Sequence, residues 1–337
     1  MTHPEPSELT IIVPTWNQSD LLQRCLTSLQ MQTLRPGILV VDNGSKDDTA
    51  NVICQFPGIK HQRLSSNLGF AKAVNAGLKI VDTPYVALLN NDTEAHPEWA
   101  EQGLIGFSLY PDYSFFASKI IQYFDRRYLD SAGDCYPASG LPCKRGWGKP
   151  EQLFNASCEV LGACAGAAFY RREMFDQIGF LEEDYFMYLE DVEFSLRARL
   201  QGYRCRYLPR AIVYHIEAAS DPGRGSLIVS EVQDLQKTRA TVDQSKTYYS
   251  AARVFWITRN RWSLMITYQP SKHILRLVYG WSKSGLFHLL KGGFFGAFLR
   301  GLWSGLCNTP GALNKRRKWK NQCKLTAKQR RHLFHMC

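Results

Sequence analysis

The chain has 337 residues, of which 45% are hydrophobic, and a formal net charge of +11; this length allows one large core with an appended region. Its ten cysteines stand at irregular spacings with no Cys-x-x-Cys pair, which argues against a zinc module. The first residues, MTHPEPSELT, are polar and predict no secretory signal, so we expect reduced thiols and a cytoplasmic location.

The basic charge is concentrated in the last third of the chain. Residues 244–337 hold 18 of the 41 Lys and Arg residues and no Asp or Glu. The residues before them hold 23 basic against 30 acidic side chains. Opposite charge in two regions indicates two roles. We therefore predict a larger domain over 1–244 and a basic helical region over 245–337.

The first hundred residues alternate β-branched runs with segments of helical periodicity. Strands are predicted at 9–16, 38–45, 59–65 and 85–91, and helices at 19–32, 46–55 and 69–81. Because the links between them are short, the alternation predicts βαβ units. The expected fold is α/β, with a mostly parallel sheet and helices on both faces.

Each predicted strand ends in polar residues. The ends are Pro14-Thr15-Trp16-Asn17, Asp42-Asn43-Gly44-Ser45, Ser65-Ser66-Asn67 and Asn90-Asn91-Asp92. Such residues are also typical of ordinary turns, so each end alone is weak evidence. In parallel sheets, however, ligands bind beyond the carboxyl ends of the strands. Together the four ends predict a ligand-binding rim.

The second half of the larger domain is less regular, and residues 110–160 show no clear pattern. Residues 160–175, VLGACAGAAFYRREMF, predict a strand of small residues that runs into a helix, with something close to its backbone. A further helix is predicted from apolar residues at helical spacing up to a C-cap at Gly202. Its first turn carries Glu190, Asp191 and Glu193, which the helix dipole alone could explain. The strand 210–215 then stops at His215.

In this order, the segments resemble an inverting glycosyltransferase of family 2 with the GT-A fold. The similarity covers roughly residues 9–220 and rests on IIVPTWN, VVDNGSKDDT, NLGFAKAVNAGL, LLNNDTE, YLEDVEFSLRARLQGYRCRYLP and VYHIEAAS. The segments NLGFA, LEDVEFSLR and TRNRWSLMITYQP are similar to the bacterial rhamnosyltransferase-like branch. The resemblance implies transfer of rhamnose from dTDP-rhamnose, or alternatively of a sugar from a UDP-sugar, to a glycan or lipid-linked acceptor in bacterial surface polysaccharide synthesis.

The resemblance also implies roles for single residues. Asp92 is expected to bind Mg²⁺ or Mn²⁺ with His215 as a second ligand, although Asn90 and Asn91 replace the second acid of the family's Asp-x-Asp or Asp-Asp pattern. Asp191 is expected to be the general base, with Glu190 as a supporting acid; the reverse assignment stays open. The nucleotide-sugar donor is expected to contact Pro14, Thr15, Asn17, Asp42, Asn43, Asn67, Gly69, Phe70, Asn75 and Asn91.

The basic region combines cationic and apolar side chains. A helix over 248–268 is expected to pack on the larger domain, and 271–291 forms an amphipathic segment with Lys272, Arg276 and Lys283 on one side. Gly292-Gly293 should end it. No uncharged apolar stretch reaches the roughly 18 residues of a membrane span. We expect this region to lie on the anionic inner face of the cell membrane, with a disordered basic tail at 314–334 as the alternative.

Three other protein classes were weighed. A nucleic-acid-binding protein fits the basic charge, but no zinc finger, RNP-type motif or helix-turn-helix is recognisable, so no nucleic acid is expected as a partner. A dinucleotide-dependent oxidoreductase would carry Gly-x-Gly-x-x-Gly after the first strand, and this chain does not. A nucleotidyltransferase would share the nucleotide rim and differ by releasing pyrophosphate.

Overall fold

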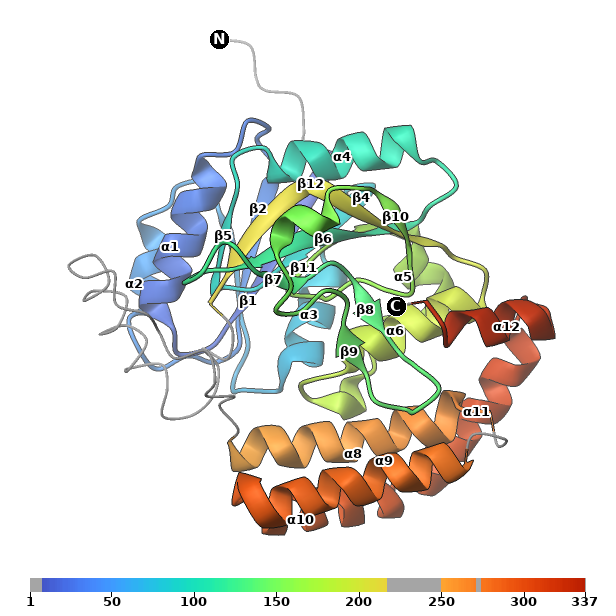
Figure 1. Ribbon diagram of the computed structural model, residues 1–337. Coiled ribbons are helices and arrows are strands. Elements are labelled where there is room, and N and C mark those ends of the chain that lie inside the picture. Colours follow the sequence, from blue (N-terminus) through green and yellow to red (C-terminus); the bar gives the residue numbers. More distant parts are fainter. Residues whose placement is uncertain (1–7, 217–249, 271–273, 337) are drawn as a thin grey trace.

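The computed structural model describes residues 8–216, 250–270 and 274–336 (Figure 1). The first hundred residues form the predicted alternation of strands and helices. The bounds are β1 Leu9–Thr15, α1 Ser19–Gln30, β2 Gly37–Asp42, α2 Thr49–Cys54, β3 Lys60–Arg63, α3 Phe70–Leu78 and β4 Tyr85–Leu89. The strands end earlier than predicted because their last polar residues lie beyond the paired part of the sheet, in the loops that form its rim.

The rest of the larger domain is built from shorter pieces. The bounds are β5 Thr93–Ala95, α4 Trp99–Leu109, β6 Phe115–Gln122, β7 Leu129–Ser131, β8 Asp134–Cys135, β9 Cys143–Lys144, η1 Glu151–Phe154, β10 Cys158–Val160, β11 Ala167–Arg171, α5 Glu173–Ile178, η2 Glu183–Tyr185, α6 Glu190–Leu200 and β12 Cys205–His215. Between 110 and 160 most strands have only two or three residues, too few for a visible periodicity.

The main sheet is mixed, with strand order β10-β12-β6-β11-β4-β1-β2-β3. Strands β4, β1, β2 and β3 are parallel, as are β6 and β12, whereas β11 runs antiparallel between β4 and β6. Strand β5 pairs with β12 and β7 with β6. The mixed α/β fold, with helices around a central sheet, is confirmed.

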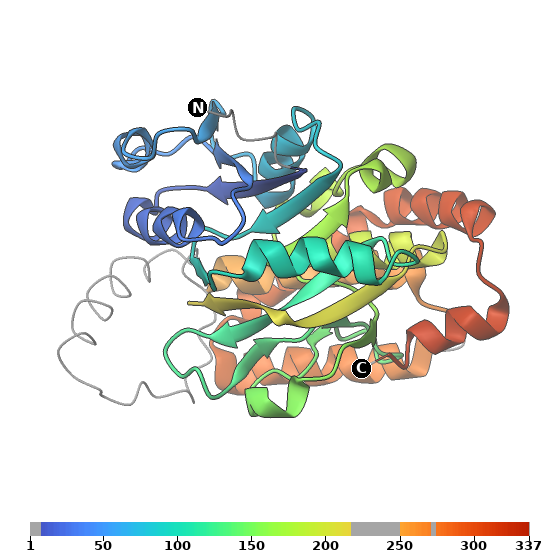
Figure 2. The ribbon, with the colours of Figure 1, turned by 90° about the horizontal axis from the view of Figure 1, so that it is seen from above.

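Alternate residues of each strand enter opposite cores, as the period of two requires. Ile12 belongs to a cluster with α3, α5 and α6, whereas Ile11 and Val13 belong to a cluster with α1, α2 and α4. Figure 2, seen from above, shows α4 covering its side of the sheet and running roughly along the strands. The two faces of the sheet are therefore covered by different helices.

The basic region folds into helices on one side of this domain. They are α8 Ala251–Tyr268, α9 Ile274–Phe287, the π-helix η4 His288–Gly292, α10 Phe295–Cys307, α11 Thr309–Gln322 and α12 Ala327–Leu333. Figure 1 shows α8, α9 and α10 together below the sheet, and α11 and α12 rising beside α6. As predicted, the helix ends at the glycine pair, where Gly293 has a left-handed φ of 64°. Within the described residues no helix is long and apolar enough to cross a membrane.

A third hydrophobic cluster joins the two regions. It combines Val192 and Leu196 of α6 with Leu264 and Tyr268 of α8 and with side chains of α11 and α12. The helix predicted over 248–268 therefore packs on the larger domain as expected, and the segment 314–334 is largely helical. Of the predicted basic stripe, exposed Lys283 is described, whereas Lys272 and the side chain of Arg276 lie outside the described residues.

Candidate active site

Asp92 and His215 meet where β4 and β12 end. Strand β5 pairs with the end of β12 so that Thr93 lies opposite His215, and the Ile216 amide donates to the Asp92 carbonyl at 3.0 Å. These pairings bring Asp92 Oδ1 to 3.2 Å from His215 Nε2. Both residues are buried. The structure thus brings together the two residues predicted to be metal ligands.

The surroundings of this pair suit a cation. Asp92 Oδ1 is buried and has no hydrogen-bond partner of adequate geometry. On the other side of the ring, His215 Nδ1 lies 2.8 Å from Asp130 Oδ2, and Asp130 also pairs with Lys144 at 2.6 Å. A carboxylate behind a histidine fixes the ring as it does in metal sites. The oxygen and nitrogen donors therefore fit a divalent ion such as Mg²⁺ or Mn²⁺.

The pKa of His215 reflects the two carboxylates that flank its ring. Burial alone would lower the pKa of His215, but the carboxylates of Asp92 and Asp130 outweigh it and raise that pKa to about 10. Without an ion, this position therefore favours a positive charge on the ring. A bound cation would supply that charge in its place.

Glu190 and Asp191 open helix α6 at another wall of the same pocket. Asp191 accepts hydrogen bonds from the Ala165 amide at 3.1 Å and from the Val192 amide at 2.8 Å. Burial raises the pKa of Asp191, and these two donors partly oppose the rise. Glu190 is more deeply enclosed, its Oε2 has no partner, and burial holds its pKa well above the usual range. Of the two, Asp191 is thus the better supported anion.

The loop before α6 is held in an unusual backbone conformation. Phe186, Tyr188 and Leu189 have left-handed φ angles of 57°, 68° and 68°. Such residues cost about 1–3 kcal/mol each and persist only where the surroundings enforce them. Gly69 lies against this loop with φ of 92°, and a Cβ there would come within 2.6 Å of Phe186. A glycine is therefore required at this predicted site position.

The small residues of segment 160–175 allow a close approach, as predicted, and the approaching element is α6. A Cβ on Gly162 would lie 2.2 Å from the Ser195 hydroxyl. The same proximity lets the Ala165 amide reach the Asp191 carboxylate. The glycine-rich connection between β10 and β11, most of which was predicted to be strand, thus contacts α6 directly at the residue predicted to be the base.

The sequence analysis missed a second acidic group beside Asp191. Side-chain ligand atoms of Asp134, Cys164 and Asp191 all lie within 4.8 Å of one another. Asp134 is buried, its Oδ2 has no hydrogen-bond partner, and burial together with the Asp191 charge raises its pKa well above the usual value. Lys144 lies opposite Asp134 in the β8–β9 pair. The signal available was the acid pair in the segment DSAGD, residues 130–134.

These groups line one cavity of about 310 Å³. It is lined by the predicted metal-ligand pair, the predicted base and Asp134. Two side chains of α8, in the basic region, also line it. The principal lining residues are Phe70, Asn90, Asp92, Asp134, Lys144, Cys164, Glu190, Asp191, His215, Arg253 and Ile257.

Most predicted nucleotide contacts lie at the rim beside this cavity and bond to one another. Asn91 Nδ2 donates to the Thr15 hydroxyl at 2.9 Å and to Gln18 at 2.8 Å. Asn43 Nδ2 donates to Asn67 Oδ1 at 3.0 Å and to the Gly69 carbonyl at 3.2 Å. The rim at the ends of β1, β2 and β4 is therefore ordered by its own side chains.

Other predicted contacts occupy different positions. Pro14 lies inside β1. The backbone N–H of Asn17 donates to the Ser45 hydroxyl at 3.0 Å. Asp42 is fully buried and accepts from the Ser45 amide at 2.7 Å, with Arg63 3.5 Å away. Asp42 thus has no exposed surface toward a ligand in this conformation.

Asn75 is also buried, and its amide is fully engaged within the protein. It donates to the Leu181 carbonyl at 2.9 Å and to Glu183 at 3.1 Å, and accepts from the Leu181 amide at 3.0 Å. Its side chain fastens α3 to the segment that leads to α6.

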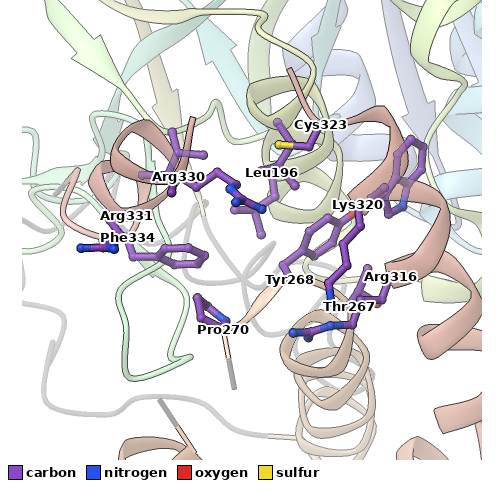
Figure 3. Close-up of a pocket in the computed structure, with 14 residues that line it drawn as sticks. Leu196, Thr267, Tyr268, Pro270, Arg316, Lys320, Cys323, Arg330, Arg331 and Phe334 are labelled. Carbon is purple, nitrogen blue, oxygen red and sulfur yellow. The ribbon is translucent and has the colours of Figure 1, made fainter. Parts of the chain in front are cut away.

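A second cavity, of about 390 Å³, lies where α6, α8, α11 and α12 meet (Figure 3). Figure 3 shows the cationic side chains of Arg316, Lys320, Arg330 and Arg331 around the apolar rings of Tyr268 and Phe334. It shares no lining residue with the first cavity, so none of the predicted site residues borders it.

Comparisons with known proteins identify the family of the chain and relatives of its fold. Residues 10–179 match the family described as glycosyl transferase family 2. The chain is 28% identical over 245 residues to N-acetylglucosaminyl-diphospho-decaprenol L-rhamnosyltransferase of Mycobacterium tuberculosis, an alignment that covers 63% of this chain and 77% of the relative.

Two solved structures are similar in fold. A crystal structure of GalNAc-T7 with UDP, GalNAc and Mn²⁺ has a TM-score of 0.53 at 14% identity, and covers 77% of this chain and 51% of that one. Staphylococcus aureus TarS has a TM-score of 0.52 at 15% identity, and covers 97% of this chain and 55% of that one. The chain thus spans about half the length of both structures, and at these identities the likeness concerns the fold alone.

Proposed function

Since this chain belongs to glycosyl transferase family 2, in its rhamnosyltransferase-like branch, we propose that it is an inverting enzyme that moves rhamnose from dTDP-rhamnose to a lipid-linked glycan acceptor of bacterial surface polysaccharide synthesis. The observation that carries the proposal is the 310 Å³ cavity, whose walls include the Asp92–His215 pair and Asp191. The name of the Mycobacterium tuberculosis relative supports rhamnose as the sugar and a lipid-linked acceptor.

In the proposed reaction, Asp191 takes the proton of the acceptor hydroxyl as its oxygen attacks the anomeric carbon. The new bond forms on the face opposite the leaving group, so the configuration inverts. The bond between the anomeric carbon and the diphosphate oxygen breaks, and its electron pair leaves with the nucleoside diphosphate. Glu190, whose pKa is held well above the usual range by burial and by the Asp191 charge, is the supporting acid in this proposal.

We propose that Asp92 and His215 hold Mg²⁺ or Mn²⁺, with Asp130 fixing the imidazole ring from behind. The bound cation would stabilise the negative charge of the diphosphate leaving group. The Mn²⁺ and UDP named with the GalNAc-T7 structure support a divalent cation in this fold.

For the nucleotide we propose the rim formed by Thr15, Asn43, Asn67 and Asn91, with Gly69 and Phe70 at its junction with the cavity and with the backbone at Pro14 and Asn17 beside it. Amide side chains supply the donors and acceptors that a thymine or uracil edge uses. Asp42 and Asn75 would act from behind the rim, Asp42 by orienting the Ser45 amide and Asn75 by holding the segment at Leu181.

We also propose that the basic helical region, 245–337, attaches the enzyme to the anionic inner face of the cell membrane. Several large apolar side chains of α9, η4 and α10 are exposed, among them Leu290 (69%) and Trp303 (70%). Exposed Lys283 and Arg300 belong to the same helices. Apolar insertion combined with attraction to anionic lipid is the usual basis of such attachment.

A donor screen tests the proposed activity. The purified protein is incubated with dTDP-rhamnose and with UDP-sugars, in Mg²⁺, in Mn²⁺ and with chelator, and donor hydrolysis and thermal stabilisation are measured. We expect metal-dependent release of dTDP and the largest stabilisation by dTDP with metal. Turnover of a UDP-sugar instead would replace the donor assignment, and pyrophosphate release from a nucleoside triphosphate would replace the enzyme class.

A further inference from the structure

The strained loop before the base is held from outside the larger domain, by one side chain of α8. Asn260 is fully buried, and its Nδ2 lies 2.8 Å from the Tyr185 carbonyl oxygen, 3.0 Å from that of Met187 and 2.9 Å from that of Tyr188. The two amide hydrogens are thus shared among three carbonyl groups. At the end of η2 and in the loop that follows it, Asn260 supplies these carbonyls with a donor.

Neighbouring side chains of α8 contact the same loop. Arg259 Nη1 donates to the Asp184 carbonyl at 2.6 Å and to Asn260 Oδ1 at 2.9 Å. The Trp256 ring stacks on Phe186, with ring centroids 4.8 Å apart and an interplanar angle of 14°. Residues 256, 259 and 260 share one helix face because they are three and four positions apart. That face of α8 therefore packs against the loop through all three side chains.

A buried asparagine with satisfied hydrogen bonds is, in most proteins, a purely structural residue. Here the bonded carbonyls belong to the few residues before Glu190 and Asp191, within the stretch that contains the left-handed Phe186, Tyr188 and Leu189. A shift of that turn would move the start of α6 and with it the Asp191 carboxylate. Displacements of about 1 Å in a catalytic group can cost about 100-fold in rate.

We propose that Asn260 is a positioning residue for the transfer reaction: by holding the carbonyls of Tyr185, Met187 and Tyr188 it fixes the start of α6, and so aims Asp191 into the cavity. This inference rests on the proposed function, in which Asp191 is the base. Asn260 itself does not line the cavity, and it bonds to the loop rather than to the rim or the Asp92–His215 pair. Its loss should therefore lower kcat and leave donor binding intact.

The test uses the full-length protein and the variants Asn260→Asp and Asn260→Ala. Asn260→Asp keeps the shape and replaces the two N–H donors by at most one O–H donor. We expect kcat to fall roughly 10- to 100-fold, with the KM for donor and the thermal stabilisation by nucleoside diphosphate and metal unchanged. Arg259→Gln should act in the same direction with a smaller effect, and it supplies a second variant that disturbs the core less.

The matched control is Thr267→Val on the same helix. Thr267 is buried and its hydroxyl donates to the Ala312 carbonyl at 3.4 Å, away from the loop. This variant should lose stability and keep kcat. Hydrogen–deuterium exchange of the peptide spanning 185–191 provides a readout that needs no activity. Exchange should be slow in the wild type, faster in the Asn260 variants and unchanged in Thr267→Val.

Each outcome decides the proposal. Fast hydrogen–deuterium exchange of residues 185–191 in the wild type would contradict the claim that Asn260 holds this loop. Faster exchange with unchanged kcat would overturn the positioning role, and equal losses of kcat in Asn260→Asp and Thr267→Val would reduce Asn260 to a structural residue. A wild type with slow loop exchange and no transferase activity would instead refute the proposed function, because the exchange measurement stands apart from it.

Discussion

The two sides of the cavity are built by different means. On the rim side, Thr15, Asn43 and Asn91 lie at the ends of β1, β2 and β4, which are adjacent in the sheet, and they bond to residues at the ends of neighbouring strands. On the base side, Asp191 follows a strained loop whose carbonyls are bonded by Asn260, far along the chain. In our proposal, donor recognition therefore belongs to the sheet, whereas the position of the base depends on a helix packed against it.

Loss of Asp92 should have the largest effect, and it tests the side built by the sheet. Asp92→Ala should abolish transfer and the thermal stabilisation by nucleoside diphosphate with Mg²⁺ or Mn²⁺, because it removes the one carboxylate beside His215 Nε2. The fold should persist, since the pairing of Asp92 with Ile216 uses the backbone. Glu94→Ala, in β5 just after Asp92, is the control and should be active. Metal-dependent turnover by Asp92→Ala would remove the metal site from our proposal.

Asp191→Asn tests the side of the cavity that carries the proposed base. It preserves volume and should lower kcat by about 10²–10⁴-fold, the usual cost of losing a general base. Nucleotide binding, measured by thermal shift, should be unchanged because the rim is untouched. Glu190→Gln is the paired control and should retain most activity. If Glu190→Gln is inactive and Asp191→Asn is nearly normal, the two roles are exchanged.

Lys144 connects the two sides, and its removal should shift the pH dependence. It pairs with Asp130 behind His215, and its charge also lowers the pKa of Asp191. A base acts only when ionised, so activity falls as pH drops through the pKa of Asp191. Lys144→Met should raise that pKa and move the acid limb of the kcat/KM profile to higher pH. Lys149→Met, an exposed neighbour, should leave the profile unchanged; an unshifted limb in Lys144→Met would contradict the charge coupling.

The smallest effect is expected from a substitution of one exposed apolar side chain in the helical region. Trp303→Ser should weaken co-sedimentation with anionic vesicles and leave kcat on a soluble acceptor unchanged. Salt should weaken attachment without eliminating it, because charge is screened within about 10 Å at 0.1 M while apolar burial remains. Leu153→Gln, with a comparable exposure of 72%, is the control outside this region. Wild-type protein that stays in solution with anionic vesicles at low salt would refute the membrane role.

The same contrast explains what the sequence could predict. The strands and helices of the first hundred residues carry strong periodicity, and their polar ends share one rim because parallel strands end together. Asp92 and His215 were both predicted, and the structure brings them within 3.2 Å. Their partner Asp130 was missed because it lies on β7, a strand of three residues in a stretch without periodicity.

The sequence also did not reveal how the base is held. The segment TRNRW reads as part of an ordinary helix, and nothing local marks Asn260 as a partner of carbonyls at 185–188. The same holds for Asn75, whose place after the NLGF segment suggested a ligand contact while its amide in fact holds Leu181. Contacts between distant segments decide both roles, and a single sequence does not encode such contacts in any local pattern.

The packing of α6 has a consequence for chimeras made between related enzymes. Phe194 and Ala198 belong to the core of the sheet, whereas Val192 and Leu196 belong to the cluster shared with α8, α11 and α12. The segment that matches the family, 10–179, ends before this helix begins. A chimera that took only this segment would inherit one parent's donor rim and the other parent's base, histidine ligand and α8. If the proposed roles are right, donor recognition and the base of such a chimera would come from different parents, with the junction just ahead of α6.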